Sequence, residues 1–369
     1  MSAVYLDYNA TSPLRLEVKR AMAEALDNYG NPSSIHQAGR AARKKIEEAR
    51  VAVATSVGVA PHRVIFTSNG SEANNTILRC VKSVQTILIS AIEHDSVRRA
   101  VPDAVIIPVD QQGLIKLEAL ENLLQAAQAP ALVSVMLANN ETGAIQPIAE
   151  VVEIAKRFGA YVHTDAVQAF GKMPVNFIEL GVDAMTIAAH KVGGPKGVGA
   201  LIVNERIPLS PFLLGGGQER NLRAGTENVP AIIGFGALAQ CLKAQENEWN
   251  RQQNLRDYTE EQILVLSPNA TILAKGAPRL PNTSCLALPA WRSETLLLQF
   301  DLSGIAVSSG AACSSGKVKP SHVLQAMNIS EDIVQSALRV SIGWKTVKAD
   351  IDAFLNRVKS LHEDKTLAA

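Results

Sequence analysis

Short, almost uninterrupted apolar runs alternate along the chain with segments of helical periodicity, and this alternation constrains the fold most. The runs are rich in Val and Ile, which is typical of strands buried on both faces of a parallel sheet. The intervening segments space their apolar residues three and four apart, as amphipathic helices do. We therefore predict an α/β fold with a mostly parallel seven-stranded sheet and helices on both faces. The predicted strands are 64–67, 86–92, 105–109, 131–138, 160–164, 184–188 and 198–203.

The pattern changes after about residue 237. A long polar helix is predicted over 237–264, and shorter elements follow it. They are the predicted strands 283–288, 305–308 and 337–341 and the predicted helices 294–302, 321–327 and 348–361. We expect a large domain over 14–255 and a smaller α+β domain made of 1–13 and 256–369.

Charge and composition exclude several classes of protein. The 369 residues contain 36 Lys and Arg against 35 Asp and Glu, so no global field attracts the chain to nucleic acid or to an anionic membrane. No apolar run of about 18 residues is present, and the first residues do not resemble a signal peptide, so we expect a cytoplasmic protein without a membrane span. No two cysteines have the CxxC spacing of a disulfide or metal framework, so no metal site is predicted. The four cysteines are Cys80, Cys241, Cys285 and Cys313.

The first chemically informative segment follows the predicted strand 64–67. It reads Thr-Ser-Asn-Gly-Ser-Glu, and a helix is predicted to begin within it. Free N–H groups at a helix start bind anions, and Gly70 lets a phosphate approach the backbone closely. The alternative is an ordinary helix cap, with Ser68 or Ser71 as the capping residue.

Two further predicted strands end in polar residues. Asp165 follows the strand 160–164, with Gln168 three residues later, and Lys191 follows the strand 184–188 in a glycine-rich turn. A lysine placed there is poorly solvated, which lowers its pKa towards that of a reactive amine. The alternatives are an aspartate that caps the next helix and a surface lysine.

These three segments together suit pyridoxal phosphate. The helix start would hold the phosphate, Asp165 would keep the pyridine nitrogen protonated so that the ring can accept electrons, and Lys191 would form a Schiff base. His94, which follows the strand 86–92, could stack on the ring, although a lone histidine also suits a structural role.

A loop of small residues near 308–320 contains Cys313. Buried cysteines usually lie among apolar residues, whereas this one lies among Ser, Gly and Ala. An accessible thiol with thiolate character is a nucleophile. The alternative is an incidental loop cysteine.

As a set, these segments resemble a cysteine desulfurase of the NifS/IscS type, in the class V branch of the fold-type I pyridoxal phosphate enzymes. The matching segments run nearly end to end: 5–11, 31–36, 67–75, 93–94, 139–143, 163–168, 190–197, 215–226, 308–315 and 338–341. The Ser-Ser-Gly-x-Ala-Cys loop is similar to the long loop of the first subgroup, and the Arg-x-Gly-His-His-Cys signature of the second subgroup is absent.

The resemblance implies a function and partners. It implies conversion of L-cysteine to L-alanine with transfer of sulfur as a persulfide on Cys313, in the service of iron–sulfur cluster assembly. It also implies a homodimer that hands sulfur to a scaffold or other acceptor protein.

The resemblance also assigns roles to individual residues. Lys191, Cys313 and His94 correspond to catalytic residues, with Lys191 as the Schiff-base lysine. Arg339, with Asn140, corresponds to the substrate-binding pair, and a guanidinium suits this task because it pairs bidentately with a carboxylate. The implied cofactor-binding residues are Gly70, Ser71, His94, Asn140, Asp165, Gln168, His190, Lys191 and Thr226, the last reaching the phosphate of the neighbouring subunit.

One position departs from the family pattern, and several rival functions remain. Ala188 stands where the family commonly has a phosphate-binding serine. A selenocysteine lyase and a class V aminotransferase are the nearest alternatives, although an aminotransferase needs no loop cysteine. A binding or scaffold module without catalysis is a third alternative. A dinucleotide-binding protein is disfavoured because the first strand-to-helix turn lacks G-x-G-x-x-G.

Overall fold

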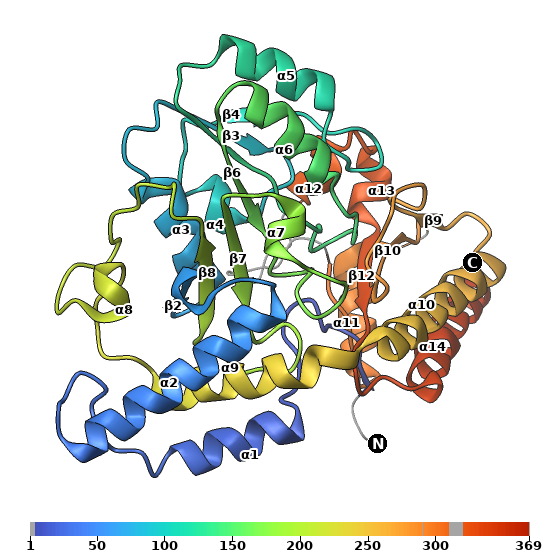
Figure 1. Cartoon of the computed structure of the whole chain (residues 1–369). Helices are drawn as coiled ribbons and strands as arrows, with labels where there is room; N and C mark the ends of the chain where they lie inside the picture. The colour runs from blue at the N-terminus through green and yellow to red at the C-terminus, as the bar shows by residue number, and fades with distance from the viewer. Residues whose placement is uncertain (1–3, 290, 310–319, 369) are drawn as a thin grey trace.

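The structure is a computed structural model, in which residues 4–289, 291–309 and 320–368 are described. Seven strands form the central sheet in the order β2-β8-β7-β6-β5-β3-β4 (Figure 1). Strands β4, β3, β5, β6 and β7 are parallel to one another, and β8 runs antiparallel to β2 and β7. The predicted mostly parallel seven-stranded sheet is therefore confirmed. The strands are β2 Val64–Thr67, β3 Thr86–Ser90, β4 Val105–Ile107, β5 Ala131–Ser134, β6 Tyr161–Asp165, β7 Ala184–Ala188 and β8 Gly199–Val203.

Helices cover both faces of this sheet, as predicted. Successive strand residues belong to different core clusters, because side chains alternate between the two faces of a sheet. In β8, Ala200 and Ile202 pack in the cluster that contains α2, α5, α6 and α9, whereas Leu201 packs in the cluster that contains α3 and α4. The helices of this part of the chain are α1 Leu16–Ala25, α2 Gln37–Ser56, α3 Gly70–Cys80, α4 Asp95–Arg98, α5 Leu117–Ala126, α6 Ile148–Arg157, α7 Phe177–Leu180, α8 Gln218–Asn221 and α9 Val229–Cys241, with the 3-10 turns η1 Pro61–Arg63 and η2 Leu242–Ala244.

A smaller unit lies beside the sheet (Figure 1). Its three-stranded antiparallel sheet has the order β12-β10-β9, and β1 pairs with β11 in a separate parallel ladder. Leu6 packs in the same core cluster as residues of α10, α11 and α14. This packing supports the predicted division into a large domain (14–255) and a small one (1–13 and 256–369), which we retain as a proposal. The elements are β1 Val4–Tyr5, α10 Glu246–Leu266, β9 Thr271–Ile272, β10 Thr283–Ala287, α11 Ser293–Leu302, β11 Ile305–Ala306, α12 His322–Ala326, α13 Glu331–Gln335, β12 Ala337–Ser341 and α14 Lys348–Ala368.

The prediction of one polar helix over 237–264 is wrong. The structure has α9 and α10, with the 3-10 turn η2 between them. The backbone N–H of Leu242 still bonds to Leu238, but Gln245 has non-helical backbone angles. The first helix is apolar and packs on α1 and α2, whereas the second is polar and packs on α14. The two helices thus pack against different partners. The break between them lets the chain change direction from the first set of partners to the second.

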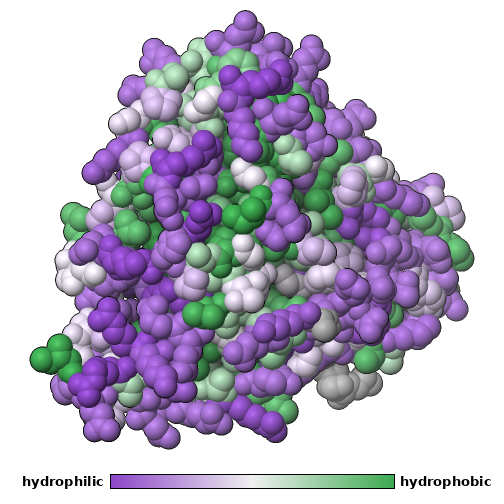
Figure 2. All heavy atoms as spheres, viewed as in Figure 1, coloured by the Kyte–Doolittle hydropathy of each residue, from purple (hydrophilic) through white to green (hydrophobic). Residues whose placement is uncertain are grey.

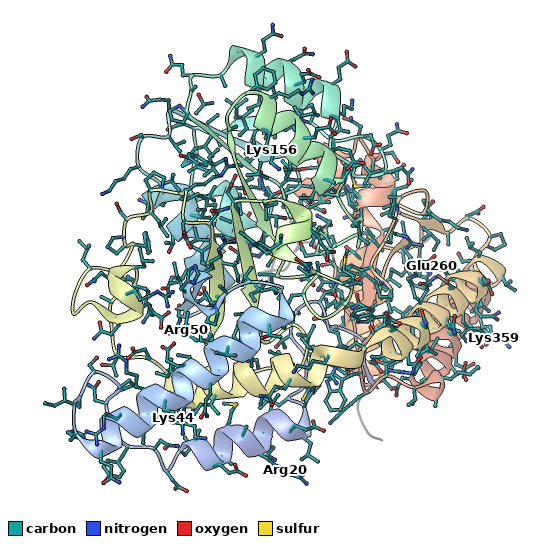
Figure 3. All side chains as sticks on the ribbon, in the orientation of Figure 1. Arg20, Lys44, Arg50, Lys156, Glu260 and Lys359 are labelled. Atoms are coloured by element: carbon teal, nitrogen blue, oxygen red, sulfur yellow. The ribbon has the colours of Figure 1, made fainter. Side chains whose placement is uncertain are left out.

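A buried ion pair fixes the segment that follows β8. Glu219 has a left-handed backbone, with a φ of 45°, and its two neighbours on the C-terminal side are left-handed as well. Each such residue costs about 1 kcal/mol. The Glu219 carboxylate accepts two hydrogen bonds from Arg50, at 2.6 and 2.8 Å, and one from the Phe66 backbone N–H at 2.9 Å (Arg50 is labelled in Figure 3). These three bonds hold the strained segment against β2.

Replacing Glu219 with alanine is expected to lower the free energy of unfolding by about 3 kcal/mol, because the buried Arg50 charge loses its buried carboxylate and keeps only the half-exposed Glu47 as a charged partner. Glu47 offers a matched control. It also pairs with Arg50, at 3.1 Å, but its side chain is 52% exposed. Glu47→Ala is therefore expected to cost less than about 1 kcal/mol. Urea denaturation of the three proteins measures both values, and equal losses for the two variants would contradict this account.

No helix in the described part of the chain is long and apolar enough to cross a membrane. On the face seen in Figure 2, hydrophilic residues predominate and apolar residues are interspersed among them.

Candidate active site

A cavity of about 110 Å³ lies where the central strands end. Loops after β2, β3, β5, β6 and β7 supply its walls. The structure thus brings eight of the predicted site residues together from five segments. They are Gly70, Ser71, His94, Asn140, Asp165, Gln168, His190 and Lys191.

Helix α3 begins at the cavity wall with Gly70. Its N-cap is Asn69, whose side chain accepts from the Glu72 N–H at 2.8 Å, so the capping alternatives Ser68 and Ser71 are wrong. A Cβ at Gly70 would lie only 2.8 Å from Val167 Cγ2, so a larger residue would not fit without displacing this wall. The first N–H groups of such a helix have no acceptor within the helix, so this helix start is the place where the sequence predicts an anion site.

Asp165 is the last residue of β6 and is 6% exposed. One carboxylate oxygen accepts from Asn74 Nδ2 at 2.7 Å, and the other accepts from the Val167 N–H at 2.9 Å. The second contact caps the following turn, so the structural alternative is also realised. Asp165 forms no ion pair within the described ranges, so no cation contacts this buried carboxylate directly, although Lys191 lines the same cavity. A protonated heterocyclic nitrogen would supply such a contact.

Lys191 stands three residues after β7 and lines the cavity. Its Nζ donates to the backbone oxygens of Asn9 at 2.8 Å and Ala10 at 2.9 Å. Burial, and secondarily the charge of Arg339, lowers the pKa of Lys191 to about 8. A substantial fraction of the amine is therefore neutral near physiological pH, as a nucleophilic amine requires.

The two cavity histidines differ in their surroundings. Burial lowers the pKa of His190 to about 4, with further lowering by Lys191 and Lys196, so this ring is neutral at pH 7 and offers hydrogen bonds rather than charge. His94 is exposed, and its Nδ1 accepts from the Ser96 N–H at 3.1 Å. This contact orients the ring, and His94 is one of the residues that line the cavity.

Arg339 reaches the cavity indirectly. Its guanidinium donates to the Asn140 backbone oxygen at 3.0 Å and to Asp7 Oδ1 at 2.7 Å. The residue is 4% exposed, so its ion pair with Asp7 is not a surface salt bridge. Its Nε is buried and has no partner among the described residues, so this donor remains unused. An unused buried donor is costly, and a substrate carboxylate would satisfy the guanidinium further.

Arg339 and Thr226 are not among the residues that line this cavity. Thr226 lines a separate hollow with Ser68 and Arg223. Cys313 lies outside the described residues, and so does most of the predicted loop at 308–320. The described N-terminal end of that loop is tied to the site, because the backbones of Ser308 and Arg339 exchange hydrogen bonds at 2.6 and 3.2 Å.

Sequence reasoning missed two buried residues that join the site residues. Asn9 is 1% exposed, and its backbone oxygen accepts from both Lys191 and Gln168 Nε2, the latter at 3.0 Å. Lys172 is 4% exposed and donates to the side chains of Asn9 and Gln168. A lone lysine in the apolar sequence Ala-Phe-Gly-Lys-Met-Pro-Val was the available signal.

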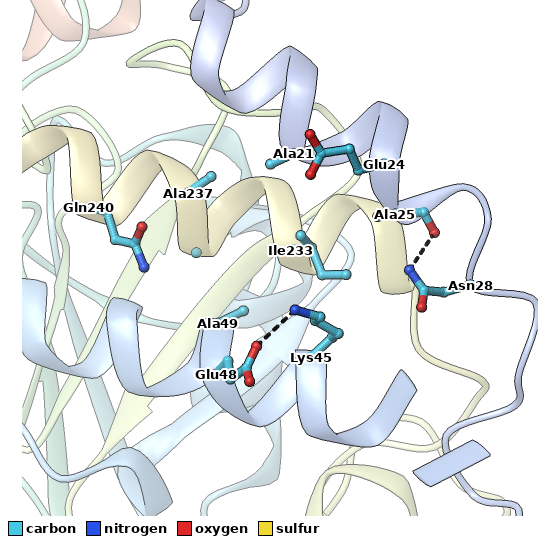
Figure 4. A pocket seen from close by; sticks show the side chains of 11 residues that line it. Ala21, Glu24, Ala25, Asn28, Lys45, Glu48, Ala49, Ile233, Ala237 and Gln240 are labelled. Carbon is cyan, nitrogen blue, oxygen red and sulfur yellow. Dashed lines mark hydrogen bonds and ion pairs between the residues drawn. The ribbon is translucent and has the colours of Figure 1, made fainter. Parts of the chain in front are cut away.

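A larger hollow, of about 270 Å³, lies between α1, α2 and α9 (Figure 4). Most of the residues that line it have small or apolar side chains. Lys45, which also lines it, pairs with Glu48 at 3.3 Å. It brings together no group that could act as a nucleophile or hold a cofactor. No cluster of metal-ligating side chains occurs in the described part of the chain either.

The residues around the cavity fit pyridoxal phosphate. A helix start without room for a side chain, a buried carboxylate without a cation in direct contact and an amine of lowered pKa correspond to the phosphate, the ring nitrogen and the aldehyde of this cofactor. The sheet and this cavity together define an α/β enzyme of the pyridoxal phosphate-dependent class.

Comparison with known proteins narrows this class. Residues 4–354 match the family model of the class-V aminotransferases. The chain is 40% identical to the cysteine desulfurase IscS of Dictyoglomus turgidum, over 98% of this chain and 94% of the relative, and 42% identical to a cysteine desulfurase of Cereibacter sphaeroides, over 96% and 94%. A solved NifS-like protein from Rickettsia africae superposes with a TM-score of 0.91 at 38% identity, covering 98% of this chain and 99% of that one. The chain belongs to the class-V aminotransferase family and, within it, to the branch of the cysteine desulfurases, which confirms the resemblance. Pyridoxal phosphate is the cofactor of this family.

Ala188 lines the cavity and is 1% exposed. We expect Ala188→Ser to bind pyridoxal phosphate about fivefold more tightly, because a hydroxyl near the phosphate site adds one hydrogen bond worth about 1 kcal/mol. Fluorescence titration of the two apoproteins with the cofactor measures the ratio. Equal dissociation constants would show that the remaining groups already satisfy the phosphate.

Proposed function

We propose that the protein is a pyridoxal phosphate-dependent cysteine desulfurase that converts L-cysteine to L-alanine and passes the sulfur to Cys313 as a persulfide. The observation that carries the proposal is the meeting of Lys191, Asp165 and the start of α3 around one cavity. The near-full-length similarity to proteins named cysteine desulfurases supports the choice of reaction within the family.

The cavity residues would hold the cofactor from several sides. Gly70 and Ser71 at the start of α3, with His190, would bind the phosphate, and Asp165 would accept a hydrogen bond from the ring nitrogen. His94 would contact the ring, and Asn140 and Gln168 would contact the phenolic oxygen, as the resemblance implies and their position on the cavity wall allows. When bound, pyridoxal phosphate supplies an electron sink that stabilises negative charge at Cα of an amino acid.

The chain itself would supply the acid–base and nucleophilic groups. Lys191 would bind the cofactor covalently, and its released amine would then take the proton from Cα of the substrate. Arg339 would hold the substrate carboxylate. The Cys313 thiolate would attack the substrate sulfur, so that a sulfur–sulfur bond forms, the carbon–sulfur bond breaks and the carbon product leaves as alanine.

Three further assignments belong to the same proposal. The acceptor would be an iron–sulfur scaffold or another protein that takes the persulfide sulfur. The protein would act as a homodimer, in which Thr226 reaches the phosphate of the neighbouring subunit. Its place would be the cytoplasm.

Cofactor loading offers a test through pH. Because the Lys191 amine must be neutral to bind the aldehyde, the loading rate should rise with pH and level off above its pKa of about 8. Stopped-flow absorbance after mixing apoprotein with pyridoxal phosphate measures this rate. A lysine with the ordinary pKa of 10.5 would give a rate that still climbs steeply above about pH 9, and such a profile would contradict the burial argument.

The reaction itself is tested by incubating the holoenzyme with L-cysteine and a reductant. The proposal predicts release of sulfide and alanine. A cofactor-loaded protein that instead moves the amino group to an oxo acid would be an aminotransferase. One that releases selenide from selenocysteine but no sulfide from cysteine would be a selenocysteine lyase.

A further inference from the structure

Lys172 is a second buried amine beside the proposed active site. It follows β6 by seven residues, is 4% exposed and forms no ion pair within the described ranges. Its Nζ donates to Asn9 Oδ1 and to Gln168 Oε1, each at 2.7 Å. Burial, and then the charges of Lys191 and Arg339, lowers its pKa well below the ordinary value. Burying an apolar side chain at this position would cost less free energy than burying an amine. The presence of a lysine here therefore suggests a specific role for its amine.

The contact with Gln168 fixes the direction of an amide. Both the charged and the neutral amine have a hydrogen for each of the two acceptors. The oxygen of the Gln168 amide points at Lys172, so its nitrogen must point the other way. One hydrogen of Nε2 is donated to the Asn9 backbone oxygen at 3.0 Å, and Gln168 also lines the cavity. The side of this amide away from Lys172 therefore carries one further N–H donor and no acceptor.

The contact with Asn9 fixes a second amide. Asn9 Oδ1 accepts from Lys172 and from Asn282 Nδ2, the latter at 3.1 Å. Asn9 Nδ2 is thereby turned to the Asn140 backbone oxygen at 3.2 Å and to Thr283 Oγ1 at 2.9 Å. Every polar atom of the side chain is satisfied in this orientation only, because the flipped amide would place a nitrogen against two donors.

The same residue links Lys172 to the reactive lysine. The Asn9 backbone oxygen accepts from Gln168 Nε2 and from Lys191 Nζ, at 3.0 and 2.8 Å. Asn9, Gln168 and the two lysines therefore form one closed network, in which Lys172 contributes only donors. In such a network, the orientation of each amide is set by its neighbours rather than chosen freely.

We propose that Lys172 is a positioning residue, which locks the Gln168 carboxamide so that it presents its remaining N–H donor rather than its oxygen to the cofactor cavity. The proposal rests on the proposed function, because it assumes that pyridoxal phosphate fills this cavity with an oxygen near Gln168. An N–H donor stabilises a negatively charged oxygen there, whereas the amide oxygen would repel it. Lys172 thus acts through Gln168 and touches neither cofactor nor substrate.

The test compares Lys172→Met, Gln168→Leu and the double variant as holoenzymes. The single variants should each raise the dissociation constant of pyridoxal phosphate about tenfold, the effect of losing one hydrogen bond to a charged group. The double variant should be no worse than the weaker-binding single variant, because both changes remove the same interaction. The pH at which the absorption band of the bound cofactor changes should shift in the same direction in all three. Lys156→Met, at an exposed position of α6, serves as the control and should change neither quantity.

If Lys172→Met does not fold, Lys172→Gln is used in its place. A glutamine can donate and accept, so it keeps a hydrogen bond to Gln168 but no longer dictates the direction of the amide. It should show the same loss of affinity and the same band shift, whereas Lys172→Arg, which again has only donors, should restore the orientation.

Three results would overturn the proposal. They are an unchanged dissociation constant and band in Lys172→Met or Lys172→Gln, losses that add up in the double variant, or a loss of stability without any change in the band. A wild-type protein that binds no pyridoxal phosphate would instead refute the proposed function. The two failures are therefore distinguishable.

Discussion

Lys191→Met is expected to release sulfide from L-cysteine about 10⁴-fold more slowly than the wild type. The substitution removes the amine that binds the cofactor covalently and takes the Cα proton, and general base catalysis together with covalent activation has this magnitude. The cavity should remain formed, because the Nζ of Lys191 contacts only two backbone oxygens. The yellow absorption of lysine-bound pyridoxal phosphate should be absent from the variant even when the cofactor is present in excess.

Lys196 provides the matched control for this variant. It is an exposed lysine in the same glycine-rich turn, five residues further along the chain. Lys196→Met should keep both the absorption band and the sulfide release. Equal loss in both variants would mean that the turn, rather than the Lys191 amine, is what activity requires. A Lys191→Met protein with wild-type activity would remove Lys191 from the mechanism.

Cys313→Ser is expected to lose sulfide release by at least about 10³-fold while keeping the cofactor. The hydroxyl of serine is a much weaker nucleophile towards sulfur than a thiolate, so the carbon–sulfur bond should stay intact. L-cysteine should still change the absorption spectrum of the variant, because the amine and the carboxylate of the substrate are bound by other residues. The spectral change without sulfide is the signature to look for.

Cys241→Ser controls for the loss of a thiol as such. Cys241 is partly buried at the end of α9, and burial raises the pKa of its thiol, so it is a poor nucleophile at pH 7. Its variant should release sulfide at the wild-type rate. Undiminished release by Cys313→Ser would instead show that another group accepts the sulfur.

The sequence predicted the sheet well because local composition reflects local burial there. Strands β2, β7 and β12 begin and end where the apolar runs do. The predicted strand 131–138 was too long, since β5 ends at Ser134. Residues 135–138 are nevertheless fully buried, and the N–H groups of Val135 and Leu137 bond to the end of β6. The apolar composition therefore predicted correctly that these residues are buried. It could not show where regular hydrogen bonding between β5 and its neighbouring strands ends.

The cavity was predictable to the extent that its residues end strands. Asp165 and Lys191 could be recognised because the carboxyl ends of parallel strands share one edge. The apolar stretch around Lys172 could indicate that this lysine is buried, but the contact between Asn9 and Lys172 could not be predicted, because it joins positions 163 residues apart and no local pattern encodes it. The capping residue Asn69 was missed for a different reason, since serine and asparagine cap helices equally well and only the backbone geometry decides.

The break between α9 and α10 also lay beyond sequence patterns. The residues around Leu242 include no Gly or Pro to signal the end of a helix. The break follows from tertiary packing, because α9 is held by α1 and α2 while α10 is held by α14.

The most direct test of the central claim is a single incubation of the purified, pyridoxal phosphate-loaded protein with L-cysteine and a reductant, in which absorbance, sulfide and alanine are followed together. The account predicts a yellow protein whose band changes when cysteine is added, with sulfide and alanine released in equal amounts. A yellow protein that releases neither product would keep the cofactor assignment and contradict the desulfurase reaction. A protein that stays colourless in excess pyridoxal phosphate would contradict the assignment of Asp165 and Lys191 on which the whole account rests.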